Sequence, residues 1–161
     1  MKITPIFHIL SILIMPLSGF MMVSGFVDFV YNNQNWINFF ISSTITLFVG
    51  MSVFLATRGH NDQNIDLRQA FVLTTMSWIT IAFFGALPFY LSNINLGFTD
   101  SFFESMSGIT TTGSTILISI EASPPGILVW RSLLQWLGGI GVIVMAIAIF
   151  PMLSIGGMQL F

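Results

Sequence analysis

The sequence predicts an all-α polytopic membrane protein with two leading transmembrane helices and one helix–re-entrant pore loop–helix unit. Three observations support this fold class. The 161 residues are 55% hydrophobic and only 6% charged, whereas soluble domains carry roughly 25% charged residues. Four apolar segments are long enough to cross about 30 Å of hydrocarbon as helices. A segment rich in Thr, Ser and Gly, residues 105–115, lies between the third and fourth of them.

The leading part, residues 1–57, is expected to form two transmembrane helices at about 6–29 and 36–57. The first apolar stretch contains no Asp, Glu, Lys or Arg from Ile3 to Val27. It exceeds the apolar core of roughly 7–15 residues in a cleaved signal peptide, so a membrane span is expected. Pro16 lies inside it and is expected to kink the helix without ending it.

The orientation is predicted from Lys and Arg, which favour the cytoplasmic side of a membrane. Lys2 precedes the first span, and Arg58 and Arg68 flank the charged loop 58–68. Two crossings place all three on one side, so this loop and both termini of the chain are expected in the cytoplasm. The loops expected outside carry no Lys or Arg and are residues 30–35, 92–99 and 116–126.

Residues 69–161 are expected to form the helix–pore loop–helix unit. A third span is predicted at 69–91, with Pro88 near its end, and a last span at 127–150, before Pro151. Between them, residues 100–109 carry enough apolar side chains to form a helix with an apolar face. The segment is too short to cross a bilayer. A short helix followed by an extended Thr/Gly run, between two spans, predicts a loop that enters and leaves on the outer side.

The Thr/Gly run has the chemistry of an ion filter. Backbone at membrane depth leaves helical geometry only where it is buried in protein or lines a watery cavity. A dehydrated cation needs oxygen ligands at close range, and the negative C-terminal end of a pore helix favours a cation there. The alternative is an ordinary outer turn in which Gly113 supplies a positive φ.

Five motifs occur in one order and carry a family resemblance: residues 86–89 (ALPF), 100–108 (DSFFESMSG), 110–114 (TTTGS), 135–141 (QWLGGIG) and 156–160 (GGMQL). Together they resemble the TrkH family of Trk-type potassium uptake membrane subunits, in the Trk/Ktr/HKT superfamily. The resemblance covers essentially the whole chain. It implies four helix–pore loop–helix units around one ion path. This chain then corresponds to the two leading helices and the first unit.

The resemblance also implies the ligands of a potassium site, built from backbone carbonyls on either side of the filter Gly and a Thr oxygen. By motif position, Thr111 and Thr112 are the first candidates. Thr110, Gly113 and Ser114 follow, and potassium is the only metal expected. One Gly stands where strict potassium channels have two, which predicts lower selectivity. Gly in place of Ser at this position resembles the potassium-permeable branch of the superfamily.

Arg131 lies near the outer end of the last span, where an unpaired charge is costly. It is expected to support the filter by pairing with Glu104 or Asp100, and the alternative is a side chain that extends to the lipid headgroups. Asp28 is expected to be solvated at the outer end of the first span. Close helix packing is expected at three glycines, Gly138, Gly139 and Gly141.

These features predict potassium uptake across the bacterial inner membrane, with this chain supplying the first quarter of the selectivity filter. The membrane potential would drive the cation inward. Membrane lipid is one expected partner. The family resemblance further implies a homodimer of the full-length protein and a cytosolic nucleotide-binding regulatory subunit, TrkA. Two alternatives stay open: a non-transporting fragment or membrane scaffold, and a homotetrameric cation channel with one unit per chain.

Other function classes lack support in the sequence. A net charge of −2 provides no basic face for nucleic acid. No Cys is present, which excludes disulfides and thiolate metal sites. The motifs of zinc hydrolases, phosphate-binding loops and serine nucleophiles are absent, so neither enzyme activity nor a cofactor is expected.

Overall fold

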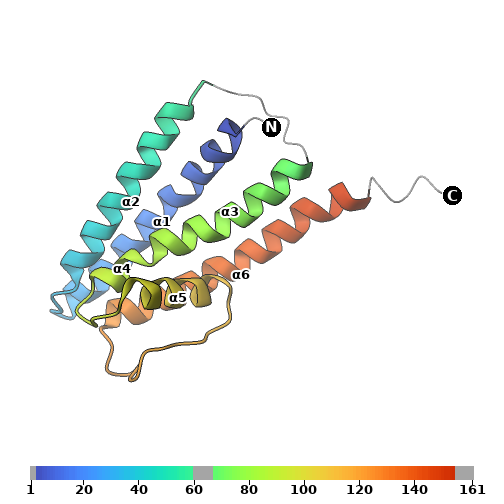
Figure 1. Cartoon of the computed structure of the whole chain (residues 1–161). Helices are drawn as coiled ribbons and strands as arrows, with labels where there is room; N and C mark the ends of the chain where they lie inside the picture. The colour runs from blue at the N-terminus through green and yellow to red at the C-terminus, as the bar shows by residue number, and fades with distance from the viewer. Residues whose placement is uncertain (1–2, 60–66, 155–161) are drawn as a thin grey trace.

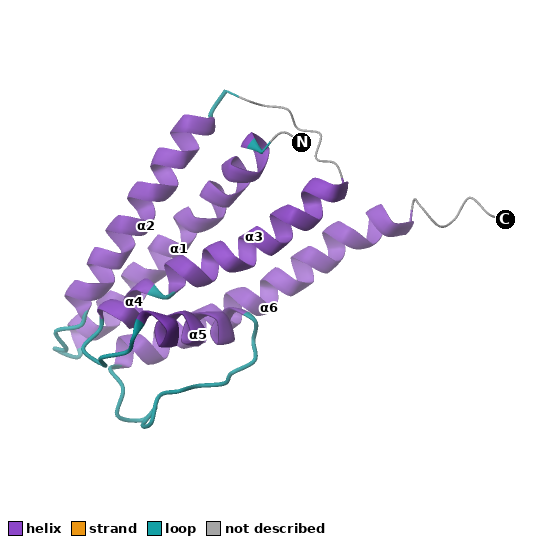
Figure 2. Ribbon diagram, viewed as in Figure 1, coloured by secondary structure: helices purple, strands orange, loops and turns teal. Residues whose placement is uncertain are grey.

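The computed structural model describes residues 3–59 and 67–154, and all regular elements within them are helices (Figures 1 and 2). The loop expected at 58–68 and the Gly156-Gly157 motif fall largely or wholly outside these residues. The described helices are α1 (Thr4–Val30), α2 (Trp36–Thr57), α3 (Leu67–Gly85), α4 (Leu87–Leu91), α5 (Phe98–Ile109) and α6 (Pro125–Ser154). Four described segments are long and apolar enough to span a membrane: Thr4–Val30, Trp36–Thr57, Arg68–Leu91 and Pro125–Ile147. The predicted fold class is confirmed.

Helix α1 is central and packs against α2, α3 and α6. It continues through Pro16 without ending, as predicted. Its close approach to α2 depends on Gly25, where a Cβ atom would lie 2.8 Å from the Cβ of Phe39. Figure 1 shows α5 beside α6 at the end of the bundle where α1 ends and α2 begins. Helix α5, which corresponds to the predicted pore helix, therefore lies at the end predicted to be outside.

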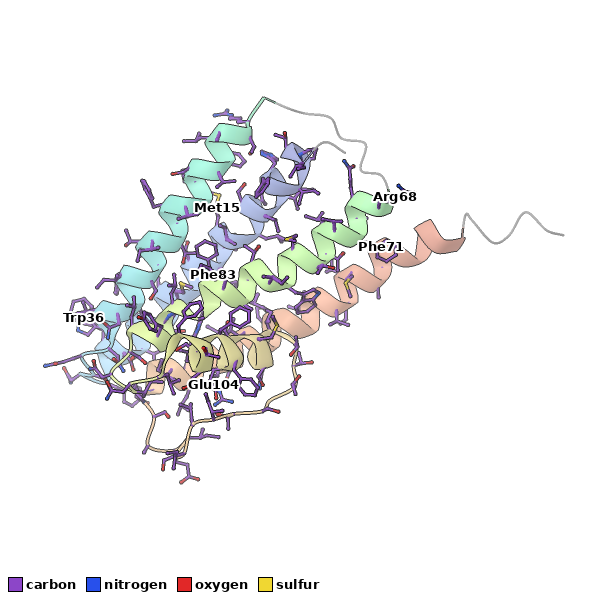
Figure 3. The ribbon with its side chains drawn as sticks, viewed as in Figure 1. Met15, Trp36, Arg68, Phe71, Phe83 and Glu104 are labelled. Atoms are coloured by element: carbon purple, nitrogen blue, oxygen red, sulfur yellow. The ribbon has the colours of Figure 1, made fainter. Side chains whose placement is uncertain are left out.

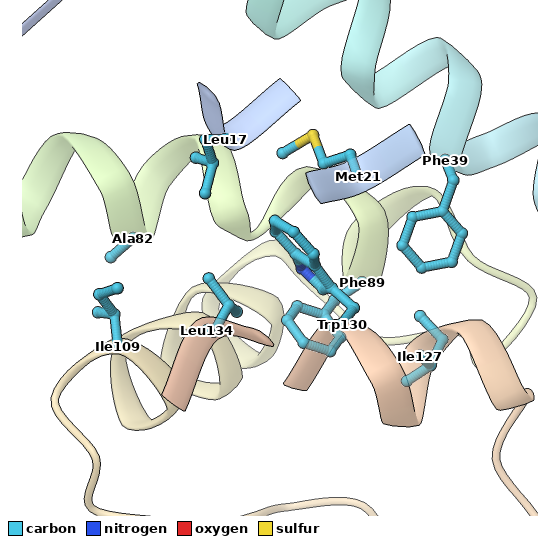
Figure 4. Close-up of a cluster of buried hydrophobic side chains, with 9 residues drawn as sticks. All are labelled: Leu17, Met21, Phe39, Ala82, Phe89, Ile109, Ile127, Trp130 and Leu134. Atoms are coloured by element: carbon cyan, nitrogen blue, oxygen red, sulfur yellow. The ribbon is translucent and has the colours of Figure 1, made fainter. Parts of the chain in front are cut away.

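A cluster of buried apolar side chains joins the helices (Figure 4). Nine buried apolar side chains from all six helices form one cluster: Leu17, Met21, Phe39, Ala82, Phe89, Ile109, Ile127, Trp130 and Leu134. Many other large apolar side chains face outward, among them Phe71 and Phe83 on α3 (Figure 3). Outward apolar side chains are expected where lipid is the solvent.

The third predicted span is not one continuous helix. Helix α3 ends at Gly85, Ala86 forms a turn, and Pro88 lies in the first turn of α4. Proline lacks an N–H group and its ring crowds the carbonyl four residues earlier, here that of Phe84. The buried indole Nε1 of Trp130 donates a hydrogen bond to the Gly85 carbonyl, 3.0 Å away, and so supplies a partner at the break.

The last helix is longer than predicted. Helix α6 begins at Pro125 rather than at residue 127 and continues to Ser154, past the expected end before Pro151. Proline is well tolerated at a helix start, where its missing N–H would have no partner. Within a membrane, neighbouring groups can also accommodate a proline inside a helix, so Pro151 is compatible with the longer α6.

Candidate cation filter

Helix α5 is amphipathic, and its buried face consists mainly of small and polar residues. The buried residues are Ser101, Glu104, Ser105, Ser107, Gly108 and Ile109. This face packs against α3 and α6. At Gly138 of α6, a Cβ atom would lie only 1.8 Å from the carbonyl oxygen of Ile109, the last residue of α5. The position of the pore-helix end therefore depends on a glycine in α6.

Within the part of the chain that the structure describes, close packing is present at Gly138 and not at the two neighbouring glycines. An added Cβ at Gly139 would meet no atom of the described residues within 4 Å. At Gly141 the nearest atom would be a ring carbon of Trp78 at 3.8 Å, an ordinary contact. The three positions face different directions around the helix, and only Gly138 faces α5.

The pore helix ends in a Schellman motif, the hydrogen-bonded turn that closes many helices. The Thr111 amide donates to the Gly108 carbonyl at 2.9 Å, and the Thr112 amide donates to the Ser107 carbonyl at 3.0 Å. Thr111 occupies the left-handed position with a φ of +60°. Glycine is usual there, and a left-handed L-residue costs about 1–2 kcal/mol. The surrounding contacts must hold this strained residue in place.

After this turn, the chain is fixed to α5 at two points. The Ser107 hydroxyl donates to the Ser114 carbonyl at 2.7 Å. One turn earlier on α5, the buried Glu104 Oε1 accepts hydrogen bonds from the Thr115 hydroxyl at 2.6 Å and the Ile116 amide at 2.7 Å. Ser107 and Thr115 were not among the residues predicted to support the filter. The i, i+3 spacing of Glu104 and Ser107, which places both on one helix face, was the available signal.

Arg131 completes this network from α6. Its Nη1 donates to the Thr115 hydroxyl at 2.7 Å and lies 3.1 Å from Glu104 Oε2. Oε2 accepts no hydrogen bond from any residue that the structure describes, so the nearby guanidinium compensates its charge mainly by proximity. Of the alternatives considered for Arg131, the structure contains the ion pair with Glu104, while Asp100 is exposed.

Residues 110–114, which include every predicted potassium ligand, are exposed in this chain. The Thr110 hydroxyl donates to the Met106 carbonyl at 2.8 Å and lies 3.0 Å from the Thr112 hydroxyl. Because Thr110 has only one hydroxyl proton, Thr112 is the donor between them, and the lone pairs of its oxygen remain available. Among the described residues, none donates a hydrogen bond to the carbonyl oxygens of residues 110–113. The Ser114 carbonyl, in contrast, already accepts one.

Asp28 contradicts the expectation of a solvated side chain. It is fully buried, and its Oδ1 accepts a hydrogen bond from the Gly126 amide at 2.6 Å. The reason is tertiary: the end of α1 packs against the start of α6, which removes Asp28 from solvent.

Known proteins are similar to this chain in sequence and in fold. Residues 35–161 match the TrkH family, described as "Cation transport protein". The chain is 43% identical over 157 residues to the Trk system potassium uptake protein TrkI of Halomonas elongata, covering 98% of this chain and 32% of that protein. It is 38% identical over 162 residues to the Trk system potassium uptake protein TrkH of Escherichia coli, covering 100% of this chain and 33% of the relative.

The crystal structure of the potassium transporter TrkH from Vibrio parahaemolyticus superimposes with a TM-score of 0.89 at 35% identity, over 99% of this chain and 34% of that one. This chain thus spans about a third of the length of the relatives it matches. The resemblance found in the sequence motifs is confirmed, and the family is one of transporters rather than enzymes. The chain is a multi-pass membrane protein that belongs to the TrkH family of cation transport proteins.

Proposed function

We propose that this chain supplies the first quarter of the selectivity filter in a potassium uptake protein of the bacterial inner membrane. One observation carries the proposal: the exposed carbonyls of residues 110–113 have no donor among the described residues, and they follow the C-terminal end of a pore helix. Unsatisfied carbonyls at membrane depth are costly, and the negative helix end favours a cation. Potassium would replace its hydration water with these oxygens as the membrane potential drives it inward.

The hydrogen bonds refine the ranking of the ligands. The carbonyl oxygens of Thr111 and Thr112 are the leading candidates for potassium ligands. The Thr112 hydroxyl oxygen is the third candidate. The carbonyls of Thr110 and Gly113 follow. Ser114 ranks last, because its carbonyl already accepts the hydrogen bond from Ser107. The network of Glu104, Thr115 and Arg131 would hold the filter strand at a fixed distance from the pore helix.

The orientation and partners belong to the same proposal. The Lys and Arg distribution supports a cytoplasmic location for both termini of this chain. The resemblance to the TrkH family supports a homodimer of the full-length protein and regulation by the cytosolic subunit TrkA. Three further pore units, supplied by the remainder of a full-length protein, would complete the ring of oxygens around the ion.

A chimera tests the proposal without depending on the length of the native chain. The corresponding third of the Vibrio relative is replaced with this chain and expressed in a host that lacks potassium uptake. Growth at low potassium and rubidium uptake are measured at matched membrane abundance. The 161-residue chain is expressed alone in parallel. Uptake by the chimera only is expected, and uptake by the short chain alone would favour a homotetramer.

The matched variants are Thr112→Val in the filter and Thr44→Val on α2. Both remove one hydroxyl from an exposed Thr that forms a local hydrogen bond. Thr112→Val is expected to lower the preference for potassium over sodium by about tenfold, which corresponds to about 1.4 kcal/mol. Thr44→Val is expected to match the unmodified chimera. An abundant chimera without uptake, or equal behaviour of the two variants, would overturn the proposal.

A further inference from the structure

We propose that Asp28, in the leading hairpin, is a positioning residue for the filter, an inference that rests on the proposed function. Its carboxylate caps α6 and thereby sets where α6 holds the pore loop. The leading hairpin would then contribute to ion selection, in addition to filling space in the membrane.

The contact itself has the chemistry of a helix cap. Asp28 Oδ1 accepts the Gly126 amide hydrogen at 2.6 Å, although 98 residues separate the two in sequence. Gly126 is the second residue of α6, and the first four amides of a helix have no partner within it. A carboxylate at this end also meets the positive end of the helix dipole. At 2.6 Å, this N···O separation lies at the short end of the range for protein hydrogen bonds.

The fit at Gly126 leaves no room for displacement toward α1. A Cβ atom at Gly126 would lie 2.5 Å from Asp28 Cγ and 2.7 Å from the carbonyl oxygen of Ser24. The Ser24 oxygen belongs to the backbone of α1, so it cannot rotate out of the way. Ile127, the residue after Gly126, and Trp130, one turn further along α6, are both fully buried. The start of α6 therefore has one defined position against α1.

Helix α6 links this cap to the filter strand. Arg131 follows Gly126 by five residues, which is about 7.5 Å along the helix axis. Its Nη1 contacts, at 2.7 Å to the Thr115 hydroxyl and 3.1 Å to Glu104, hold the strand just after the filter. Hydrogen bonds of this type extend only to about 3.2 Å, so a shift of about 1 Å in α6 would break them. Loss of the cap is therefore expected to affect ion preference through Arg131.

The test uses the same chimera, with the potassium-to-sodium preference measured at matched membrane abundance. Asp28→Leu removes the acceptor and is expected to lower the potassium preference by up to about fivefold. This is the ratio that corresponds to the free energy of one helix cap, about 1 kcal/mol. Asp28→Asn retains an acceptor at Oδ1, and its potassium preference is expected to stay within about twofold of that of the unmodified chimera. Glu121→Leu, which removes an exposed carboxylate from the loop before α6, is the control. Gly126→Ala tests the same contact from the α6 side. It is expected to lower the potassium preference as Asp28→Leu does, because the new Cβ would push α6 away from α1.

The outcomes separate this inference from the filter proposal. If the unmodified chimera shows no potassium preference, the filter proposal fails, and this inference fails with it. If the chimera prefers potassium and Asp28→Leu and Gly126→Ala both retain that preference, only the role of Asp28 is overturned. The same conclusion follows if Asp28→Asn is as impaired as Asp28→Leu, because the hydrogen-bond acceptor would then not account for the effect.

Discussion

Replacing Gly138 with Ala is the sharpest perturbation of the contact between α6 and the pore helix. The new Cβ would lie 1.8 Å from the Ile109 carbonyl oxygen and 2.7 Å from its carbonyl carbon. Real Cβ contacts essentially never fall below 3.0 Å, so the helices must separate by at least about 1.2 Å. Overpacking typically costs about 1–3 kcal/mol, and the upper end is expected here because the opposing atoms are backbone.

The neighbouring glycine provides the control. Gly139→Ala adds the same methyl group to the same helix turn, where none of the residues that the structure describes has an atom within 4 Å. Both substitutions gain helix propensity of about 1 kcal/mol, so the difference between them isolates the contact with Ile109. Thermal stability in detergent and potassium preference are measured for both variants in the full-length chimera. Gly138→Ala is expected to lose stability and preference, while Gly139→Ala keeps both. Equal stability and equal preference of the two variants would refute the packing argument.

Three further predictions concern charge, backbone and topology. Arg131→Gln leaves the buried Glu104 carboxylate unpaired, at an expected cost of about 3–5 kcal/mol in stability. Glu104→Gln in the same chain should restore part of the lost membrane abundance and uptake. Additive effects of the two substitutions in a double-mutant cycle would exclude the ion pair. Gly113→Ser should weaken the preference for potassium over sodium, because Gly113 has a φ of +76° that L-residues rarely adopt; unchanged flux ratios would contradict this. Single cysteines at Gly59 and Ile118, in a chain without native Cys, should react with an impermeant thiol reagent from the cytoplasmic and outer sides respectively, and the reverse pattern would exclude the proposed orientation.

The placement of the membrane-spanning segments was predictable from the sequence, because local properties decide it. Apolar length fixes which segments can cross a bilayer, and α2 has the predicted limits at Trp36 and Thr57. Backbone outside helices must be protected at membrane depth, so residues 110–114 were predictable from the sequence as candidate ion ligands. The motifs around them were also sufficient to indicate the family.

Contacts between distant segments required the tertiary structure. Arg131 had several plausible partners, and its pairing with Glu104 depends on how α5 lies against α6. Equally, Asp28 sits near the end of an apolar helix, where hydropathy predicts solvent, yet the start of α6 covers it. Sequence spacing could not distinguish Gly138 from Gly139, because only the direction of the neighbouring helix makes one of them crowded.

The physical reason for this division is the range of the interactions. The free energy of moving a segment into lipid is close to the sum of the transfer free energies of its own residues. The sequence of that segment therefore determines it. Hydrogen bonds and steric contacts change within a few tenths of an ångström, and here their partners come from segments as far apart as Asp28 and Gly126. The sequence by itself determined which segments enter the membrane and which residues have the oxygen chemistry of a filter. The packing of α1, α5 and α6 decided which side chains contact the candidate filter strand and which of them are buried.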